Sequence, residues 1–321
     1  MAGEFDLIAR IRERAVQRDD VDLGIGDDAA VLAIPHGLQL VVGMDTLNAG
    51  VHFPHDTAPA DIGWKALAVN LSDLAAMGAT PAWCTLSLSL PVAEPAWLDA
   101  FLDGFEALAW PHAVALIGGD TTRGPLSICV TAHGFVAPGR ALRRDAARDG
   151  DDIWVSGTLG DAAGALMQWR GGGARDAALR SRLDRPTPRV ALGDALAGIA
   201  HAAIDISDGL LADLGHIAQA SGLGAAVDIA SLPASAALRS AFDTATCRTL
   251  QATGGDDYEL CFTAPADVAD AVLDAARVSA TPVTRIGRMV AGAGVTAHMA
   301  GTPWRTPAAG WDHFATPATD G

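Results

Sequence analysis

The strongest constraint on the fold is the alternation of strand-like and helix-like apolar segments on both sides of a polar stretch, residues 139–152. That stretch carries eight charged residues and few apolar ones, a composition typical of a domain boundary. With 321 residues, the chain is about twice as long as one typical domain. We therefore predict an N-terminal domain over residues 1–138, a linker over 139–152 and a C-terminal domain over 153–321. Because strands and helices mix in both halves, the predicted class is α/β or α+β.

Apolar periodicity places the individual elements. The predicted helices cover residues 4–17, 58–77, 94–109, 162–169, 189–201, 209–221 and 265–277. The predicted strands cover residues 38–44, 83–90, 113–117, 127–136, 153–156, 203–206, 225–229, 258–263 and 283–287. Ser207 or Asp208 would cap the helix that begins at residue 209.

Composition excludes several classes of protein. No apolar run approaches the roughly 18–20 residues of a membrane span, and the first 20 residues lack the apolar core of a signal peptide, so we expect a cytoplasmic protein. A net charge of −16 argues against nucleic acid or an anionic membrane surface as the main partner. The widely spaced cysteines, which lack metal-type spacing, predict buried, reduced thiols. They are Cys84, Cys129, Cys247 and Cys261.

A recurring set of aspartates is the main functional signal. Asp27 and Asp28 occupy a glycine-rich turn, Asp45 and Asp120 follow apolar strand-like segments, and Asp73 lies in a long apolar helix. Further acids follow in the second half, at Asp205 and Asp208. Mg²⁺ takes oxygen ligands and is usually shared between one or two carboxylates and substrate phosphates. Each aspartate alone is better explained as a turn former, a cap or a solvated surface residue. Together they favour a magnesium-dependent phosphoryl-transfer site, where divalent cations reverse the local negative charge.

Other nucleotide-binding motifs are either absent or match the sequence pattern without suiting phosphate binding. The segment from Gly24 to Ala29 formally matches a dinucleotide fingerprint, but its two aspartates would face the pyrophosphate. The only lysine, Lys65, is not followed by Ser or Thr, which excludes a P-loop. His52 is equally consistent with an ordinary loop histidine, and Trp311 with a residue that covers the core.

Taken together, the motifs resemble the thiamine-monophosphate kinase family over nearly the whole chain. The similarity lies in the following segments: Gly-Ile-Gly-Asp-Asp, Lys-Ala-Leu-Ala-Val-Asn-Leu-Ser-Asp, Gly-Gly-Asp-Thr-Thr-Arg-Gly-Pro, Arg-Pro-Thr-Pro-Arg, Asp-Ile-Ser-Asp-Gly and Asp-Tyr-Glu-Leu. The resemblance implies the two-domain fold shared with aminoimidazole ribonucleotide synthetase and selenophosphate synthetase, with mixed sheets, flanking helices and a homodimeric assembly. It also implies transfer of the γ-phosphoryl group of ATP to thiamine monophosphate, with several Mg²⁺ ions as cofactor.

Site residues follow from the resemblance position by position. The implied metal set is Asp28, Gly43, Met44, Asp45, Asp73, Asp120, Asp205 and Asp208. The implied ATP contacts are Gly119, Asp120, Arg144 and Ser207. The implied contacts to thiamine monophosphate are His52, Asp256 and Trp311. The chain departs from the family at three of these places: Gly43 and Met44 replace hydroxyl residues, Asp256 replaces a longer glutamate, and position 311 is a tryptophan.

The acceptor suggests a mechanism without a general base. A phosphate monoester has a second pKa of about 6 and is already mostly ionised at pH 7. Two alternatives remain open at this point. An ATP-dependent synthetase of the same superfamily would share the acids but not the thiamine contacts, and a regulatory or scaffold protein would bind metal without turnover. ATP turnover that depends strictly on thiamine monophosphate separates all three.

Overall fold

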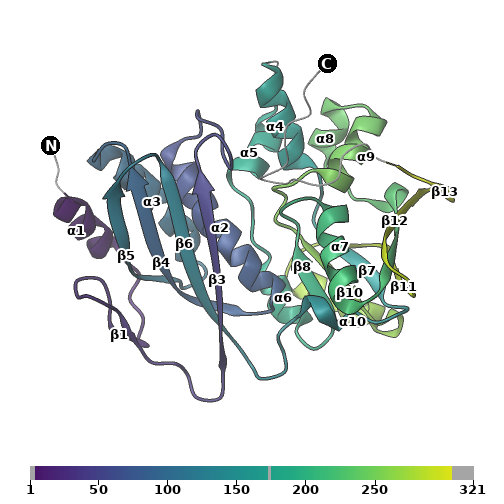
Figure 1. Ribbon diagram of the computed structural model, residues 1–321, viewed down its shortest axis with the longest axis horizontal. Coiled ribbons are helices and arrows are strands. Elements are labelled where there is room, and N and C mark those ends of the chain that lie inside the picture. Colours follow the sequence, from purple (N-terminus) through teal and green to yellow (C-terminus); the bar gives the residue numbers. More distant parts are fainter. Residues whose placement is uncertain (1–3, 173–174, 306–321) are drawn as a thin grey trace. The chain divides into compact units, whose positions relative to one another are not determined.

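The structure is a computed structural model of the 321-residue chain, and it describes residues 4–172 and 175–305. The chain forms two compact units, which are described separately (Figure 1). The first comprises Met1–Arg143, Asp184–Ala200 and Asp270–Thr281, and the second comprises Arg144–Leu183, His201–Ala269 and Pro282–Gly321.

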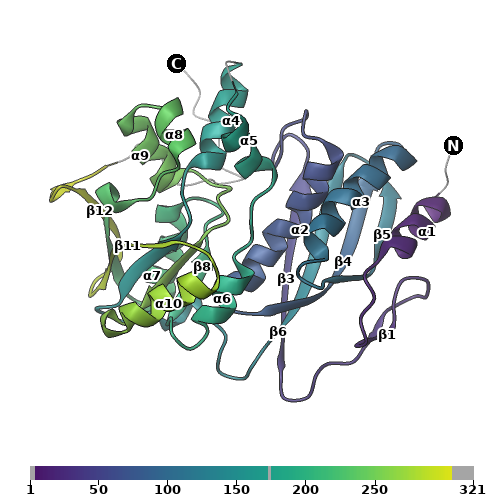
Figure 2. The same ribbon diagram turned by 180° about the vertical axis from the view of Figure 1, so that it is seen from behind.

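The first unit is built on a four-stranded mixed sheet. Its strands, in spatial order, are β3 (Gln39–Asn48), β6 (Ser127–Val136), β4 (Thr80–Leu90) and β5 (Ala115–Arg123). Neighbours are antiparallel except for β4 and β5, which run parallel. Helices α2 (Pro59–Ala76) and α3 (Pro95–Ala109) cover one face of this sheet (Figure 2). A hairpin of β1 (Val21–Leu23) and β2 (Val31–Leu32) precedes it in the chain.

Helix α2 is the centre of this unit because it is buried on almost every side. It begins with Pro59, which suits the first helical turn, and Gly78 follows it with a left-handed φ of 65°. It crosses α3 so closely that a Cβ built at Gly63 would lie 1.9 Å from the Phe101 carbonyl oxygen. Helix α1 (Glu4–Arg14) flanks α3, where Arg14 Nε donates to Glu106 Oε1 at 2.8 Å. Helix α6 (Val190–Leu196) also packs against α2.

The second unit contains a seven-stranded sheet. Its spatial order is β13 (Thr302–Pro303), β12 (Gly294–Met299), β9 (Gly224–Asp228), β11 (Val283–Val290), β7 (Asp152–Ser156), β10 (Leu260–Ala264) and β8 (Ala202–Asp205). All pairs are antiparallel except β12 with β9. Helix α7 (Leu210–Ser221) packs on it, and its apolar residues join the central core (Figure 1). A second core lies between α4 (Asp161–Gly171), α5 (Ala177–Asp184), α8 (Ala236–Ala241) and α9 (Thr244–Thr253).

The predicted class, with mixed sheets and flanking helices, is confirmed, and several element boundaries differ. Strand β3 continues past Asp45 to Asn48, and β5 contains Asp120 within it, so neither carboxylate lies after a strand end as predicted. Helices α5, α8 and α9 were not predicted, because they are short, with 8, 6 and 10 residues. The remaining elements are α10 (Ala269–Val278) and the 3₁₀ turns η1 (Arg144–Ala146), η2 (Ile229–Ser231) and η3 (Ala266–Val268).

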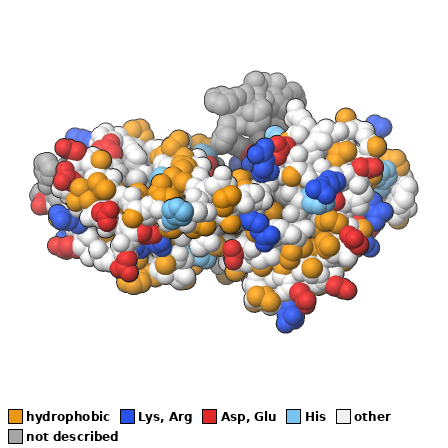
Figure 3. All heavy atoms as spheres, turned by 90° about the horizontal axis from the view of Figure 1, so that it is seen from below, with side chains coloured by type: hydrophobic (Ala, Val, Ile, Leu, Met, Phe, Trp, Pro, Cys, Tyr) orange, Lys and Arg blue, Asp and Glu red, His pale blue; other side chains and the backbone are white. Residues whose placement is uncertain are grey.

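All four cysteines are free thiols, as expected, but the expectation that they are buried holds for only three of them. Cys84, Cys247 and Cys261 are buried, and Cys129 is half-buried. Among the described residues, no helix combines the length and apolar character that crossing a bilayer requires. Hydrophobic side chains also remain on the surface among charged ones (Figure 3), and Val42 and Met44 of β3 are 55% and 62% exposed.

Candidate active site

Asp45 and Asp73 both lie where β3 packs against α2. The Asp45 N–H donates to Asn70 Oδ1 at 3.1 Å, and the Asn70 amide is itself held by the Ala66 carbonyl at 3.0 Å. Asp73 lies one helical turn beyond Asn70. A Cβ built at Gly43 would lie 3.4 Å from Asp73 Oδ2, so glycine leaves room beside this carboxylate. The structure therefore brings three predicted metal residues together, at positions 43, 45 and 73.

Met44 behaves differently from its two neighbours. Strand residues alternate between faces, and the Met44 side chain is 62% exposed on the face away from α2. Its thioether therefore does not face Asp73. Only the backbone of Met44 is available to a metal ion on the α2 side.

A second group of predicted residues surrounds a large cavity in the same unit. The cavity has a volume of about 1200 Å³ and is lined by the glycine-rich turn with Asp28, by Thr85 of β4, by Gly119 and by residues of α1. Asp120 lines a smaller adjoining pocket. A Cβ at Gly119 would lie 1.8 Å from the Leu86 carbonyl oxygen, so the close approach of β4 and β5 requires glycine there.

Strand register separates Asp45 from Asp120. Asp45 pairs with Val130, which pairs with Leu86, which pairs with Gly119, so Asp120 lies one residue further along β5 and on the opposite face. Three interstrand spacings of about 4.8 Å put β3 and β5 about 14 Å apart. The two carboxylates of one chain therefore do not approach the same ion across this sheet.

The donor chemistry of the Asp45 and Asp73 group fits magnesium. Within residues 4–172 and 175–305, no three His, Cys, Asp or Glu side chains converge closely enough to hold a metal ion by themselves. Mg²⁺ rarely uses a cage made only of protein, because it keeps waters and shares substrate phosphates. Two carboxylates on one face are therefore a suitable protein contribution to such an ion.

His52 is fixed from both ends. Its Nδ1 accepts the Asn48 N–H at 3.0 Å, and its carbonyl oxygen accepts a hydrogen bond from Lys65 Nζ at 2.9 Å. Lys65 is 1% exposed on α2, so the single lysine of the chain serves this loop. The sequence analysis used Lys65 only as evidence against a P-loop and missed its structural role. The available signal for that role was its position on the same predicted helix as Asn70 and Asp73.

In the second unit, a buried carboxylate organises the turn that contains Ser207 and Asp208. Asp213 Oδ2 accepts the backbone N–H groups of Ser207, Asp208 and Gly209, each at 3.1 Å. Burial, followed by the negative charge of Asp205, raises the pKa of Asp213 to about 7. The prediction that Ser207 or Asp208 caps α7 is wrong, since the N-cap is Gly209 and no side chain caps the helix. Asp213 in the first turn of α7 orders these N–H groups instead.

Asp256 lies directly against the same turn. Its N–H donates to the Ser207 carbonyl at 2.9 Å, and Tyr258 Oη donates to its Oδ1 at 3.2 Å. Asp256 has a left-handed φ of 67°, which is strained for a residue with a side chain. The structure therefore brings together a predicted substrate residue and a predicted nucleotide residue.

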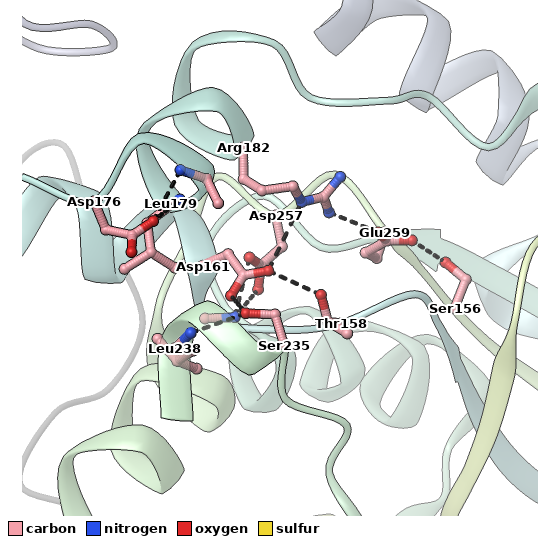
Figure 4. A network of polar contacts seen from close by, with 12 residues as sticks. Ser156, Thr158, Asp161, Asp176, Leu179, Arg182, Ser235, Leu238, Asp257 and Glu259 are labelled. Carbon is pink, nitrogen blue, oxygen red and sulfur yellow. Dashed lines mark hydrogen bonds and ion pairs between the residues drawn. The ribbon is translucent and has the colours of Figure 1, made fainter. Parts of the chain in front are cut away.

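A network of buried polar groups holds the segment after Asp256 (Figure 4). Asp257 Oδ2 accepts the Gly160 N–H at 2.8 Å, and burial raises the pKa of Asp257 well above its usual value. Glu259 accepts from Ser156 Oγ at 2.5 Å and from Arg182 Nη2 at 2.7 Å. The sequence analysis missed this network, although two acids directly before an apolar strand were a usable signal for buried, paired carboxylates.

Two further predicted residues are not joined to this group. Arg144 is exposed in η1, and its carbonyl accepts from Ser221 Oγ at 2.9 Å, at the end of α7 that is remote from Ser207. A 12-residue helix spans about 18 Å, so the structure does not place the Arg144 backbone beside Ser207. Trp311 lies outside the described residues.

Comparison with known proteins identifies relatives for both halves of the chain. Residues 26–136 match the family model of the AIR synthase related protein N-terminal domain, and residues 148–300 match that of the C-terminal domain. The chain is 50% identical over 323 residues to thiamine-monophosphate kinase of Escherichia coli (strain K12), covering 98% of this chain and 99% of that protein.

Solved structures give the same relationship. A thiamine-monophosphate kinase from Stenotrophomonas maltophilia K279a superposes with a TM-score of 0.87 at 60% identity, covering 94% of this chain and 97% of that one. A structure described as AaThiL complexed with AMPPCP and TMP superposes with a TM-score of 0.78 at 33% identity, covering 97% of each chain.

Proposed function

Because the chain belongs to the thiamine-monophosphate kinase family of AIR synthase related proteins, we propose that it transfers the γ-phosphoryl group of ATP to thiamine monophosphate. The products are thiamine diphosphate and ADP, and the reaction is the last step of thiamine diphosphate biosynthesis. The observation that carries this proposal is identity of 50% over 98% of the chain to a kinase of that name. A relative of the same fold in complex with AMPPCP and TMP supports the substrate pair.

Magnesium ions are the proposed cofactor. In the first unit the carboxylates of Asp45 and Asp73, with the backbone at Gly43 and Met44, would hold one group of ions, and the acids Asp28 and Asp120 would be ligands of other ions. In the second unit Asp205 and Asp208 would hold them. When bound, such ions would supply positive charge that offsets the repulsion between the two phosphate groups.

The residues of the chain contribute position and charge rather than proton transfer. The acceptor phosphate is already ionised at neutral pH, so no side chain needs to act as a base. Asn70 fixes the backbone of Asp45, and Asp213 fixes the turn that carries Ser207 and Asp208. Catalysis would follow from groups held in place before the substrate arrives, with direct transfer and no covalent intermediate. Gly119, Ser207 and Arg144 would contact ATP.

Recognition of thiamine monophosphate would use its permanent positive charge. Asp256 offers a carboxylate oriented by Tyr258, and an aromatic ring at Trp311 would attract the thiazolium by a cation–π interaction. His52, fixed by Asn48 and Lys65, would contribute a polar contact. These groups distinguish the proposal from an ATP-dependent synthetase.

We also propose a homodimer. On the face of β3 away from α2, the apolar side chains of Leu40, Val42 and Met44 alternate and are 40%, 55% and 62% exposed. A row of exposed apolar residues on an edge strand favours association with a second copy. Asp45 and Asp120 are far apart within one chain, which supports the same assembly. In a dimer, the Asp120 of one chain could lie near the Asp45 of the other chain. Light scattering should give a dimer mass, and Val42→Arg should give the mass of one chain.

The proposed location is the cytoplasm. Four free cysteines are typical of a reducing compartment, which is also where ATP is abundant.

The test is ADP formation from Mg-ATP with and without thiamine monophosphate. We expect ADP only when the acceptor is present and only when magnesium is present. ADP formation that is independent of thiamine monophosphate would contradict the substrate assignment and favour a synthetase with another acceptor. Absence of any ATP binding would contradict the enzyme assignment itself.

A further inference from the structure

A cationic pocket lies in the helical part of the second unit, beside α8 and α9. It has a volume of about 320 Å³. Its described lining contains the guanidinium groups of Arg239 and Arg248, the ring of Phe242, the amide of Gln251 and no Asp or Glu. This composition is unexpected in a chain with 38 acidic and 22 basic residues. The pocket is therefore suited to an anion.

The guanidinium of Arg248 is held rigidly at one side of the pocket. Its Nη1 donates to the Leu232 carbonyl at 3.0 Å and to Gln251 Oε1 at 3.1 Å, and its Nη2 donates to the Ala230 carbonyl at 3.1 Å. Gln251 is fully buried and is itself anchored, since its Nε2 donates to the same Leu232 carbonyl at 2.9 Å. Because the Arg248 side chain is already fixed in this way, it loses little conformational entropy when it binds a ligand.

Neither guanidinium is neutralised by a carboxylate in the described part of the chain. Arg239 donates from Nη1 to the Ala234 carbonyl and forms no ion pair there. Asp243, the nearby acid before α9, accepts the N–H and the hydroxyl of Thr246 at 2.9 and 2.8 Å; it keeps its negative charge but forms no ion pair with either arginine in the described structure. Burial and then the Asp243 carboxylate raise the pKa of the Cys247 thiol, and both arginines lower it, so the two guanidinium groups and this carboxylate all act on the same thiol.

The hydrogen bonds within the chain leave donors on both guanidinium groups, including the exposed Arg239, for a ligand. A guanidinium has five N–H donors. Three hydrogen bonds at Arg248 leave two donors, and one hydrogen bond at Arg239 leaves four. Guanidinium donors match phosphate oxygens in a bidentate geometry. The carbonyl oxygens that these arginines contact are neutral acceptors and do not need positively charged donors, whereas an anionic ligand would be stabilised by both charges.

We propose that this pocket binds a small phosphate monoester, with the phosphate between Arg239 and Arg248 and the organic part against Phe242. The volume lies at the lower end of the range for small-molecule pockets, so the ligand is a compact metabolite rather than a nucleotide triphosphate. No residue of this pocket belongs to the metal, ATP or thiamine sets proposed above.

The experiment is calorimetric titration of the full chain with phenyl phosphate and with inorganic phosphate, in EDTA and at low salt. Without divalent cations the acidic groups of the proposed active site repel phosphates, so the titration reports on the cationic pocket. We expect one phenyl phosphate per chain, bound more tightly than inorganic phosphate. Phe242→Ala should abolish the difference between the two probes.

Variants decide whether the arginines are responsible. Arg239→Gln combined with Arg248→Gln should weaken phenyl phosphate binding at least about tenfold, the loss expected for charge-assisted contacts. The control Arg277→Gln removes an exposed arginine that pairs with Asp274 and should leave binding unchanged. If the double variant does not fold, Arg239→Glu alone keeps the Arg248 bonds and should weaken binding similarly. Absence of binding in the native chain, binding that survives these changes, or an equal loss in the control would overturn the proposal.

Discussion

Replacing Asp213 tests whether one buried carboxylate organises the turn that carries Ser207 and Asp208. In Asp213→Leu, three N–H groups lose their acceptor, and a buried donor without a partner costs about 1–3 kcal/mol. The Gly209 N–H is fully buried, whereas the other two are half-buried and can regain water. We therefore expect a loss of about 2–4 kcal/mol in the free energy of unfolding. Asp213→Asn is the matched control, because its carbonyl oxygen can occupy the place of Oδ2, and it should cost less than about 1.5 kcal/mol.

The assay is urea unfolding of both variants and of the native chain, without divalent cations, followed by kinase activity with saturating magnesium. The leucine variant should shift the urea midpoint far more than the asparagine variant, and it should raise the KM for ATP. Equal midpoints for the two variants would show that the three hydrogen bonds do not stabilise the turn, and the reasoning would fail.

Asp213 also gives a pH dependence of defined sign. The folded pKa of about 7 lies above the ordinary value of 3.8, so between these pH values the folded state holds a proton that the unfolded chain has released. The free energy of unfolding should therefore fall as pH rises from 4 to 7, by at most about 1.4 kcal/mol per pH unit for one proton. Asp213→Asn should remove this contribution. An identical slope in the variant and in the native chain, again without divalent cations, would contradict the assignment.

Three further predictions follow from the same account. Asp73→Asn should lower kcat about 100-fold or more with an unchanged circular dichroism spectrum, because a charged transition-state contact is lost; native activity would exclude Asp73 from the metal site. Trp311→Ala should raise the KM for thiamine monophosphate about two- to tenfold, through the lost cation–π contact, with the KM for ATP unchanged. An unaltered KM for thiamine monophosphate would remove Trp311 from recognition. Gly104→Ala should lower the free energy of unfolding by at least about 1–3 kcal/mol, since its Cβ would lie 1.7 Å from the Ala60 carbonyl oxygen. The control Gly171→Ala has open space around the new Cβ and should not destabilise the chain. Equal melting temperatures for the two variants would refute the close helix contact.

The sequence predicted the class and most long elements because these depend on apolar periodicity, which is local. Helix α2 is a long, largely apolar segment that ends before Gly78, strands β4 and β6 are apolar runs, and all three lie within a few residues of their predicted bounds. Short helices such as α8 and α9 were missed because tertiary packing in the second core, rather than their own pattern, stabilises them.

The site was only partly predictable, because register and burial are properties of the folded chain. The motif at Asp45 indicated a carboxylate near a strand, but only the pairing of four strands shows that Asp120 lies on the opposite face. The role of Glu259 depends on Ser156, 103 positions away in the chain, and no local pattern reveals such a pairing. The hydrogen-bond partners of Asp213 lie only four to six positions before it, but the burial of its carboxylate is a property of the folded chain. The resemblance to a family supplied the residues, and the structure supplied their neighbours.

The most direct test of the central claim is to quantify ADP and thiamine diphosphate in one reaction of the purified chain with Mg-ATP and thiamine monophosphate, identifying the second product by mass. The account predicts that both products appear in equal amounts and that neither forms when either substrate is omitted. ADP without thiamine diphosphate, or bound ATP with neither product, would contradict the assignment of thiamine monophosphate as the acceptor.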